Sequence, residues 1–238
     1  MNTVKQSIQA IALTTTLLSI AVGATAGVSP EESTSKLLTA SFEPRQVVKI
    51  EAGDFHFVAG QPAPVHTHVA PAIGYVAKGE ILYQVEGEKI QLLREGDAFY
   101  EPAGPRILRF DNASATEEAV FIDFNLQQEN EPFIVFEKEL TEHIDRRTLP
   151  TLDLSAQSVD QVDVYVSELE AGGHKVLQSE TPVLGYVAEG VINLQGEGQA
   201  TKRIIAGESF SLPTGGSKLT AVNASSEVSA KVISFYLR

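Results

Sequence analysis

The chain has 238 residues, of which 43% are hydrophobic and 21% charged, a composition that is typical of folded proteins and excludes disordered and fibrous chains. Its formal net charge of −13 disfavours nucleic acids and anionic membrane surfaces as partners, because both are negatively charged. The absence of cysteine excludes disulfides, thiolate zinc sites, iron–sulfur clusters and a cysteine nucleophile.

The first 26 residues have the pattern of a signal peptide. They contain one cation, Lys5, and no acidic residue, followed by an apolar stretch over 8–22 and the small-x-small sequence Ala24-Thr25-Ala26. An uncleaved membrane anchor is the alternative, but 15 residues interrupted by three threonines are short and polar for a bilayer span. We therefore expect an exported protein, and the absence of cysteine favours a bacterial periplasmic or secreted one.

The chain beyond the signal peptide is predicted to consist of short strands. Residues 27–44 are predicted to be a linker, in which 31–38 could form a short helix. From 45 to 140, apolar runs alternate with turn signals such as Glu86-Gly87-Glu88 and Glu95-Gly96-Asp97, as in strands joined by tight turns. The predicted strands cover residues 47–52, 55–59, 73–77, 81–85, 90–93, 98–100, 106–110 and 119–124.

A second unit, predicted over 151–238 after a connector at 141–150, repeats the first. A short helix is predicted over 137–146, where one unit gives way to the next. Residues 71–125 align without a gap on 182–236, at an offset of 111, with 21 identities in 55 positions. The shared residues are mainly glycines, prolines and apolar residues, which determine turns and cores, so the repeat indicates a duplicated fold.

The duplicated unit is predicted to be all-β. Many short strands without intervening helices indicate a sandwich or a barrel, and two barrels of about 100 residues each fit the length. Asn112-Ala113-Ser114 and Asn223-Ala224-Ser225 correspond in the two units and match the glycosylation acceptor pattern. Their matching places in the repeat favour a structural role.

The residues of the first unit resemble the two motifs of the cupin superfamily, and the repeat makes the chain similar to a bicupin, with two tandem jelly-roll barrels at 45–140 and 151–238. The first motif runs from Gly60 through His66-Thr67-His68 to Gly79 with the family's spacing, except that Ala72 stands at the place of its glutamate. The second runs from Gly96 to Pro102-Ala103-Gly104 and then places Ile107 where the family has a histidine. The resemblance therefore implies a cupin fold with degenerate metal motifs.

The resemblance implies that His66 and His68 lie inside the first barrel and could share a divalent metal. In the family, the four motif residues hold one metal, and imidazole with carboxylate suits iron, manganese, zinc, copper or nickel. A His-x-His pair on a strand directs both rings to one face. With the glutamate and the third histidine replaced, we expect weak or conditional metal binding.

Two other residues could complete the metal site. His56 lies one strand earlier, on the opposite face from Phe55 and Phe57, and could point into the barrel. Glu101 precedes the Pro-x-Gly turn and could offer a carboxylate if it turns inward. For both, the alternative is an ordinary solvent-facing polar residue.

Arg109 is a candidate ligand-binding residue. Strand alternation places it on the same face as Ile107, which the resemblance directs into the barrel, where a guanidinium could hold a ligand carboxylate. A salt bridge to Asp111 or Glu101 is the favoured alternative, because paired buried charges are usually structural.

The second unit retains no metal-ligand set. At the offset of 111, the four metal positions become Leu177, Ser179, Val183 and Lys218. We expect this barrel to pack against the first one, as cupin subunits pair in homodimers, and the chain could also form a homo-oligomer.

Three functions remain open at this point. The first is an exported bicupin that binds a small organic molecule in its N-terminal barrel, with conditional metal binding. The second is a metal-dependent cupin enzyme, such as an oxygenase, isomerase or lyase. The third is a non-catalytic sensor or interaction module, since a fold does not determine a function.

Overall fold

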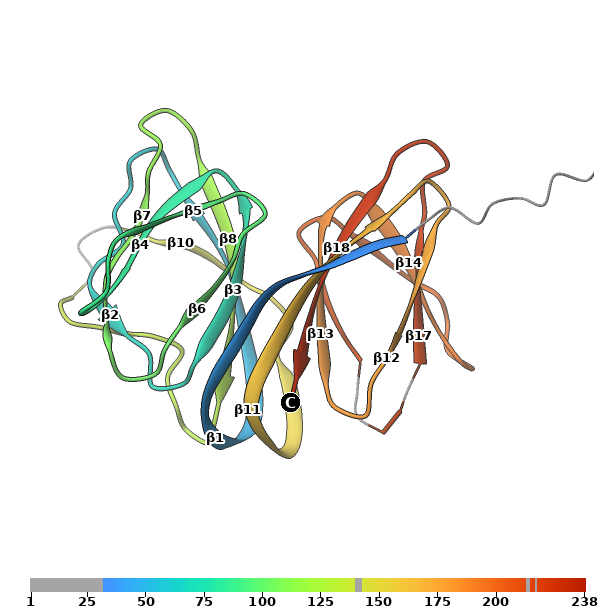
Figure 1. The fold of residues 1–238 in the computed structure, drawn as a ribbon, viewed down its shortest axis with the longest axis horizontal. Coiled ribbons are helices and arrows are strands. Elements are labelled where there is room, and N and C mark those ends of the chain that lie inside the picture. Colours follow the sequence, from blue (N-terminus) through green and yellow to red (C-terminus); the bar gives the residue numbers. More distant parts are fainter. Residues whose placement is uncertain (1–31, 140–142, 213–214, 217) are drawn as a thin grey trace, which may run out of the picture.

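The computed structural model describes residues 32–139, 143–212, 215–216 and 218–238, and these form strands, turns and loops without a helix. Figure 1 shows two β-barrels side by side, one formed by the blue to yellow part of the chain and one by the orange to red part. The predicted all-β fold of two tandem jelly-roll barrels is confirmed. The predicted signal peptide at 1–26 lies outside the described residues.

Each barrel has one sheet of its own and shares a second sheet with its neighbour. The shared sheet has the order β16-β13-β18-β11-β1-β8-β3-β6, with β10 also paired to β1. The first barrel adds the sheet β5-β4-β7-β2-β9, and the second adds β12-β17-β14-β15. The strands are β1 (Glu32–Phe57), β2 (His66–Thr67), β3 (Ala72–Lys78), β4 (Glu80–Val85), β5 (Gln91–Arg94), β6 (Ala98–Glu101), β7 (Arg106–Asn112), β8 (Ala119–Gln127), β9 (Val135–Phe136), β10 (Asp145–Thr148), β11 (Leu152–Leu169), β12 (His174–Gln178), β13 (Val183–Glu189), β14 (Val191–Gly196), β15 (Lys202–Ile205), β16 (Ser209–Leu212), β17 (Lys218–Asn223) and β18 (Ala230–Leu237).

The longest strand, β1, joins the two barrels. It pairs with β11 from Glu32 to Ile50 and with β8 from Lys49 to Phe57, and in Figure 1 its blue first half runs across to the second barrel. The described part of the predicted linker, 32–44, and of the helix predicted at 31–38 is therefore strand. Strand β11 supplies backbone partners for this segment, and such tertiary pairing overrides weak local helix preference.

The second predicted helix is also wrong in its described part. Asp145–Thr148 forms β10, which pairs with β1 from Gly53 to His56. Residues 137–139 and 143–144 are not helical, and 140–142 lie outside the described residues. The predicted connector at 141–150 thus includes a strand of the shared sheet.

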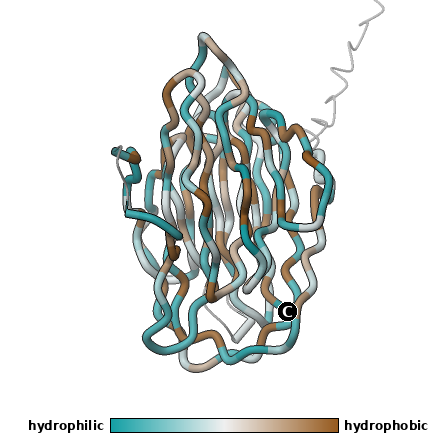
Figure 2. The backbone as a smooth tube through the Cα atoms, turned by 90° about the vertical axis from the view of Figure 1, so that its left-hand side faces the viewer, coloured by the Kyte–Doolittle hydropathy of each residue, from teal (hydrophilic) through white to brown (hydrophobic). Residues whose placement is uncertain are grey.

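Three apolar cores follow from the alternation of side chains along the strands. One core fills each barrel, and a third lies between the barrels, where the outer faces of the shared sheet meet. In β8, Phe121 points into the first barrel, whereas Ile122 and Phe124 join the core between the barrels. Figure 2 shows the resulting mixture of hydrophobic and hydrophilic positions along neighbouring strands.

Two equivalent asparagines fasten a turn in each barrel. The side-chain amide of Asn112 donates to three backbone carbonyls, and that of Asn223 does the same in the second barrel. The two residues are 4% and 3% exposed, so the structural role predicted for both acceptor patterns is confirmed.

The part of the chain that the structure describes contains no helix that is long and apolar enough to cross a membrane.

Candidate metal centre

The two motif histidines lie together inside the first barrel. His66 begins β2 and pairs with Ile107 of β7 and Phe136 of β9, and His68 follows two residues later. The residues are 4% and 2% exposed, and their ring centroids are 5.3 Å apart. Alternation along the chain therefore directs both imidazoles to one side, as the sequence predicts.

Glu101 joins the histidines from the end of β6. In the β3–β6 ladder it lies directly opposite Ala72, the residue that stands where the cupin motif has its glutamate. Directly opposed residues project from the same face of a sheet, with Cβ atoms about 5 Å apart. Glu101 thus brings a carboxylate to the same region of the barrel from the neighbouring strand.

The donor atoms of these three residues converge. The Nε2 atom of His66 lies 3.5 Å from Oε1 of Glu101, and Nε2 of His68 lies 3.3 Å from Oε2. One ligand atom from each residue lies within 4.8 Å of the others, and no other group of this kind occurs among the described residues. The spacing is that of a site that could hold one metal ion.

Backbone carbonyls orient both imidazoles for this task. The Nδ1–H group of His66 donates to the carbonyl of Pro64 at 2.8 Å, and that of His68 donates to the carbonyl of Phe133 at 3.2 Å. Such bonds place the proton on Nδ1 and leave Nε2 as the donor to a metal, as in most histidine metal sites. Both Nε2 atoms face Glu101.

The electrostatics of the site fit a bound cation. Burial alone would lower the pKa of His68, but the charge of Glu101 raises it to about 9. Burial alone would raise the pKa of Glu101, but attraction to His68 and His66 holds it below its ordinary value. Nε2 of His68 and Oε1 of Glu101 are buried without a hydrogen-bond partner. A divalent cation would satisfy both atoms in place of a proton, so the residues fit a metal.

A second buried carboxyl group, that of Asp123, lines one cavity together with His66, His68 and Glu101. The sequence analysis did not find it. It lies in β8 opposite Gly74 and is 2% exposed, with Oδ1 unpaired. Burial, followed by the negative charge of Glu101, raises the pKa of Asp123 to about 8. The sequence offered one signal: Asp123 lies two residues after Phe121, an apolar residue of the same strand that points inward, so both side chains project into the barrel.

The cavity around these groups is small. Its volume is about 20 Å³, little more than the roughly 10–15 Å³ that one water molecule requires. The polar groups occupy one part of its lining, and the remainder is apolar and mainly aromatic: Phe55, Phe57, Ala63, Phe110, Phe121, Ile134, Phe136 and Ile144. The volume of this chamber is far below the roughly 300–1,000 Å³ of sites that bind organic molecules.

His56 does not belong to the metal group, which consists of His66, His68 and Glu101. Phe55 and Phe57 belong to the core of the first barrel, and His56 projects from the other face of β1. Its ring nitrogens lie 3.2 Å from carboxylate oxygens of Asp54 and Glu118. The side chain is held by these two acids and contributes no donor to the converging set.

Arg109 does not point into the barrel, contrary to the prediction from alternation. The β4–β7 ladder pairs Gln84 with Arg109 but Val85 with Ile107, so Leu108 is an extra residue. This β-bulge reverses the facing of the residues that follow it. The Arg109 side chain is 47% exposed and lies 3.7 Å from Asp111, the salt-bridge partner predicted as the alternative.

The second barrel has no corresponding group in its described part. Leu177 and Val183 are buried core residues, and Lys218 is exposed. The ladder between β14 and β17 runs without a register shift, so Leu219 rather than Lys218 faces inward.

Comparisons with known proteins agree with this architecture. Residues 53–125 match the family of the cupin domain. Among solved structures, the chain is similar to a salicylate 1,2-dioxygenase from Pseudaminobacter salicylatoxidans, with a TM-score of 0.55 and 14% identity over 80% of this chain and 71% of that one. No curated protein sequence matches the chain significantly.

Two further structures show how widely the fold is shared. A mutant oxalate decarboxylase from Bacillus subtilis has a TM-score of 0.57 and 15% identity over 88% of this chain and 77% of that one. Procruciferin, an 11S globulin from Brassica napus, has a TM-score of 0.60 and 12% identity over 84% of each chain. At such identities these likenesses concern the fold alone: the chain has the fold of two tandem jelly-roll barrels, the first of which matches the cupin domain over residues 53–125.

Proposed function

We propose that this chain is an exported bicupin whose first barrel binds one divalent transition metal through His66, His68 and Glu101. The observation that carries the proposal is the convergence of three buried donors, two of which have no hydrogen-bond partner at the atom that faces the group. The carboxylate supplies the negative charge that a site of two neutral imidazoles would lack. Metal binding is therefore tighter than the two histidines alone predict.

The chain's own residues shape the chemistry at this site. Two imidazoles and one carboxylate suit iron, manganese, zinc, copper or nickel, and such a metal, when bound, supplies a Lewis acid with open positions. The carbonyls of Pro64 and Phe133 hold the imidazoles in orientation. The aromatic wall limits the water that reaches the donors.

The size of the chamber favours a metal-dependent enzyme that acts on a very small ligand over a barrel that binds an organic molecule. A cavity of about 20 Å³ accepts water or a molecule of two or three atoms, such as dioxygen. An organic substrate bound at the metal would have to displace wall residues such as Phe136. The salicylate dioxygenase and oxalate decarboxylase of similar fold act on organic molecules, as their names state, so this chain would differ from them.

Elemental analysis of the purified protein tests the proposal. After loading with Mn²⁺, Fe²⁺, Zn²⁺, Ni²⁺ or Cu²⁺ and removal of excess metal, we expect about one ion per chain for at least one of these metals. Glu101→Gln should lose that ion, and His56→Ala, the matched control outside the group, should retain it. Equal metal content in the wild type and Glu101→Gln, or no retained metal in the wild type, would overturn the proposal.

A further inference from the structure

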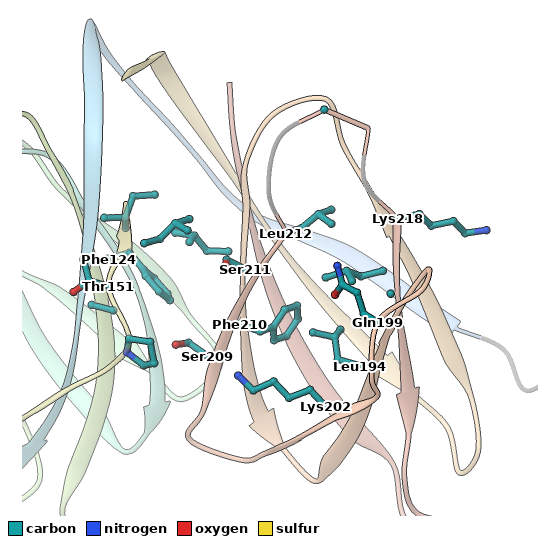
Figure 3. Close-up of a pocket in the computed structure, with 18 of the residues that line it drawn as sticks. Phe124, Thr151, Leu194, Gln199, Lys202, Ser209, Phe210, Ser211, Leu212 and Lys218 are labelled. Atoms are coloured by element: carbon teal, nitrogen blue, oxygen red, sulfur yellow. The ribbon is translucent and has the colours of Figure 1, made fainter. Parts of the chain in front are cut away.

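A cavity lies beside the second barrel, at the junction of the two barrels. This cavity has a volume of about 490 Å³, within the roughly 300–1,000 Å³ of small-molecule sites, which occur preferentially at domain interfaces. Its walls come from β1, β8 and the segment 150–152 on one side and from the second barrel on the other. Figure 3 shows Phe124 and Thr151 on one side and Ser209 and Ser211 of β16 on the other.

The internal repeat shows why this space exists. In the first barrel, β6 places Tyr100 opposite Ile73, and in the second, β16 places Ser211 opposite the equivalent residue, Leu184. The ring of Tyr100 packs against the apolar core between the barrels and stacks on Phe42, with centroids 6.3 Å apart. At the equivalent place beside β16, a serine replaces the tyrosine. Part of the cavity is thus the space that an aromatic ring fills in the other half of the molecule.

Three polar side chains around this space have no partner among the residues that the structure describes. The hydroxyls of Ser209 and Ser211 make no hydrogen bond with any described residue, and Lys202 forms no ion pair within the described part of the chain. In Figure 3 the Lys202 side chain extends toward Ser209, whereas Lys218 points away from the cavity. Glu197 is the one carboxylate among the lining residues, and it does not pair with Lys202. A cation and two hydroxyls therefore stand beside an apolar surface.

We propose that this inter-barrel cavity binds an aromatic carboxylate. The ring of the ligand takes the place that Tyr100 fills in the first barrel, against Phe124 and Leu184. Its carboxylate accepts a charge-assisted hydrogen bond from the ammonium of Lys202 and a second hydrogen bond from the hydroxyl of Ser209. The site is separate from the metal group, which lies inside the first barrel.

Isothermal titration calorimetry with benzoate tests this site, with benzamide as the uncharged counterpart. Benzoate should bind the full chain at least tenfold more tightly than benzamide. Ser211→Tyr, which restores the first barrel's residue, should abolish benzoate binding and raise the melting temperature. Lys202→Gln should weaken it at least tenfold, because glutamine, as at the equivalent Gln91, carries no charge.

Control variants separate this site from unspecific charge and from the metal centre. Arg203→Gln, which removes an exposed cation that is not among the lining residues, should bind benzoate within twofold of the wild type, and so should His66→Ala. If Ser211→Tyr does not fold, benzoate binding by Lys202→Gln still tests the proposal, because Lys202 is exposed and its substitution should leave the fold intact. No benzoate binding by the wild type at about 10 mM, equal affinity for benzamide, or unchanged binding in Lys202→Gln would overturn the proposal.

Discussion

Ala72 of β3 lies directly opposite Glu101 of β6, and the two residues are 0% and 3% exposed. The carboxylate of the metal group therefore stands one strand away from the place that the cupin motif gives it. Because opposed residues share a face, a carboxylate can serve the same pair of histidines from either strand. This relationship between neighbouring strands carries the proposed metal site.

Exchanging the two residues should preserve metal binding. Glu101→Ala alone should lose the ion. The double variant Ala72→Glu, Glu101→Ala should recover most of it, because Ala72→Glu restores a carboxylate on the same face and Glu101→Ala makes room for it. Elemental analysis after loading measures both, with Ala72→Gln, Glu101→Ala as the uncharged control. Recovery in that control as well would show that the carboxylate is not a ligand.

Metal affinity should fall as the pH is lowered. In the metal-free protein the pKa of His68 is raised to about 9, so at pH 7 a cation must displace a proton from its ring. The pKa of Glu101 lies below its ordinary value, so this carboxylate stays ionised in the same range. Competition with a chelator should show an apparent Kd that rises about tenfold for each pH unit from 9 down to 7. An affinity that is constant over this range would argue against His68 as a ligand.

The chamber should admit small ligands and reject larger ones. In the Co²⁺-loaded protein, azide should change the visible absorption spectrum, whereas oxalate should not, since the cavity measures about 20 Å³. Phe136→Ala removes part of the wall, so the spectrum of this variant should change at oxalate concentrations at least tenfold below the highest one that leaves the wild-type spectrum unchanged. Val135→Ala, on the neighbouring residue that is 41% exposed, should behave like the wild type. A spectral change with oxalate in the wild type would show that the chamber opens without a mutation.

Asp163 should stabilise the junction of the barrels. It accepts hydrogen bonds from Lys36 at 2.9 Å and Thr39 at 2.7 Å in β1, and from Arg238 at 2.8 Å. Burial alone would raise the pKa of Asp163, but these donors lower it from 3.8 to about 2. The side chains of Lys36 and Arg238 are about half exposed, so solvent screens these ion pairs, and we expect a stabilisation of about 1 kcal/mol.

Because the folded-state pKa is lowered, this stabilisation is present above about pH 4 and is lost as the pH falls toward 2. Urea unfolding at pH 7 should show Asp163→Ala to be about 1 kcal/mol less stable than the wild type, with the difference shrinking below pH 4. Asp160→Ala, an exposed acid of the same strand, should cost little. A difference for Asp163→Ala that persists unchanged at pH 2 would contradict the ionic origin of the effect.

The turns and cores of both barrels could be predicted from the sequence because they depend on local residues. Glycines, prolines and alternating apolar residues recur at one offset, and most strands form where those patterns place them, although the strands predicted at 47–52 and 55–59 are parts of the single strand β1. The crossing of β1 into the second barrel could not be predicted, because its backbone partner, β11, lies more than 100 residues away in the chain. Local propensity carries no information on such pairing.

The site was predictable in part for the same reason. The spacing of His66 and His68 on one strand predicts that they share a face, whereas the place of Glu101 depends on the register between β3 and β6. The facing of Arg109 was predicted incorrectly because one extra residue, Leu108, reverses the alternation. The position of Asp123 in the chamber could not be predicted, because the sequence does not show that β8 lines the chamber.

Anomalous diffraction from crystals of the metal-loaded protein tests the central claim most directly. We predict one strong peak inside the first barrel, about 2.0–2.2 Å from Nε2 of His66, Nε2 of His68 and a carboxylate oxygen of Glu101. A peak that excludes Glu101, or metal bound elsewhere with these three side chains unchanged, would contradict the account.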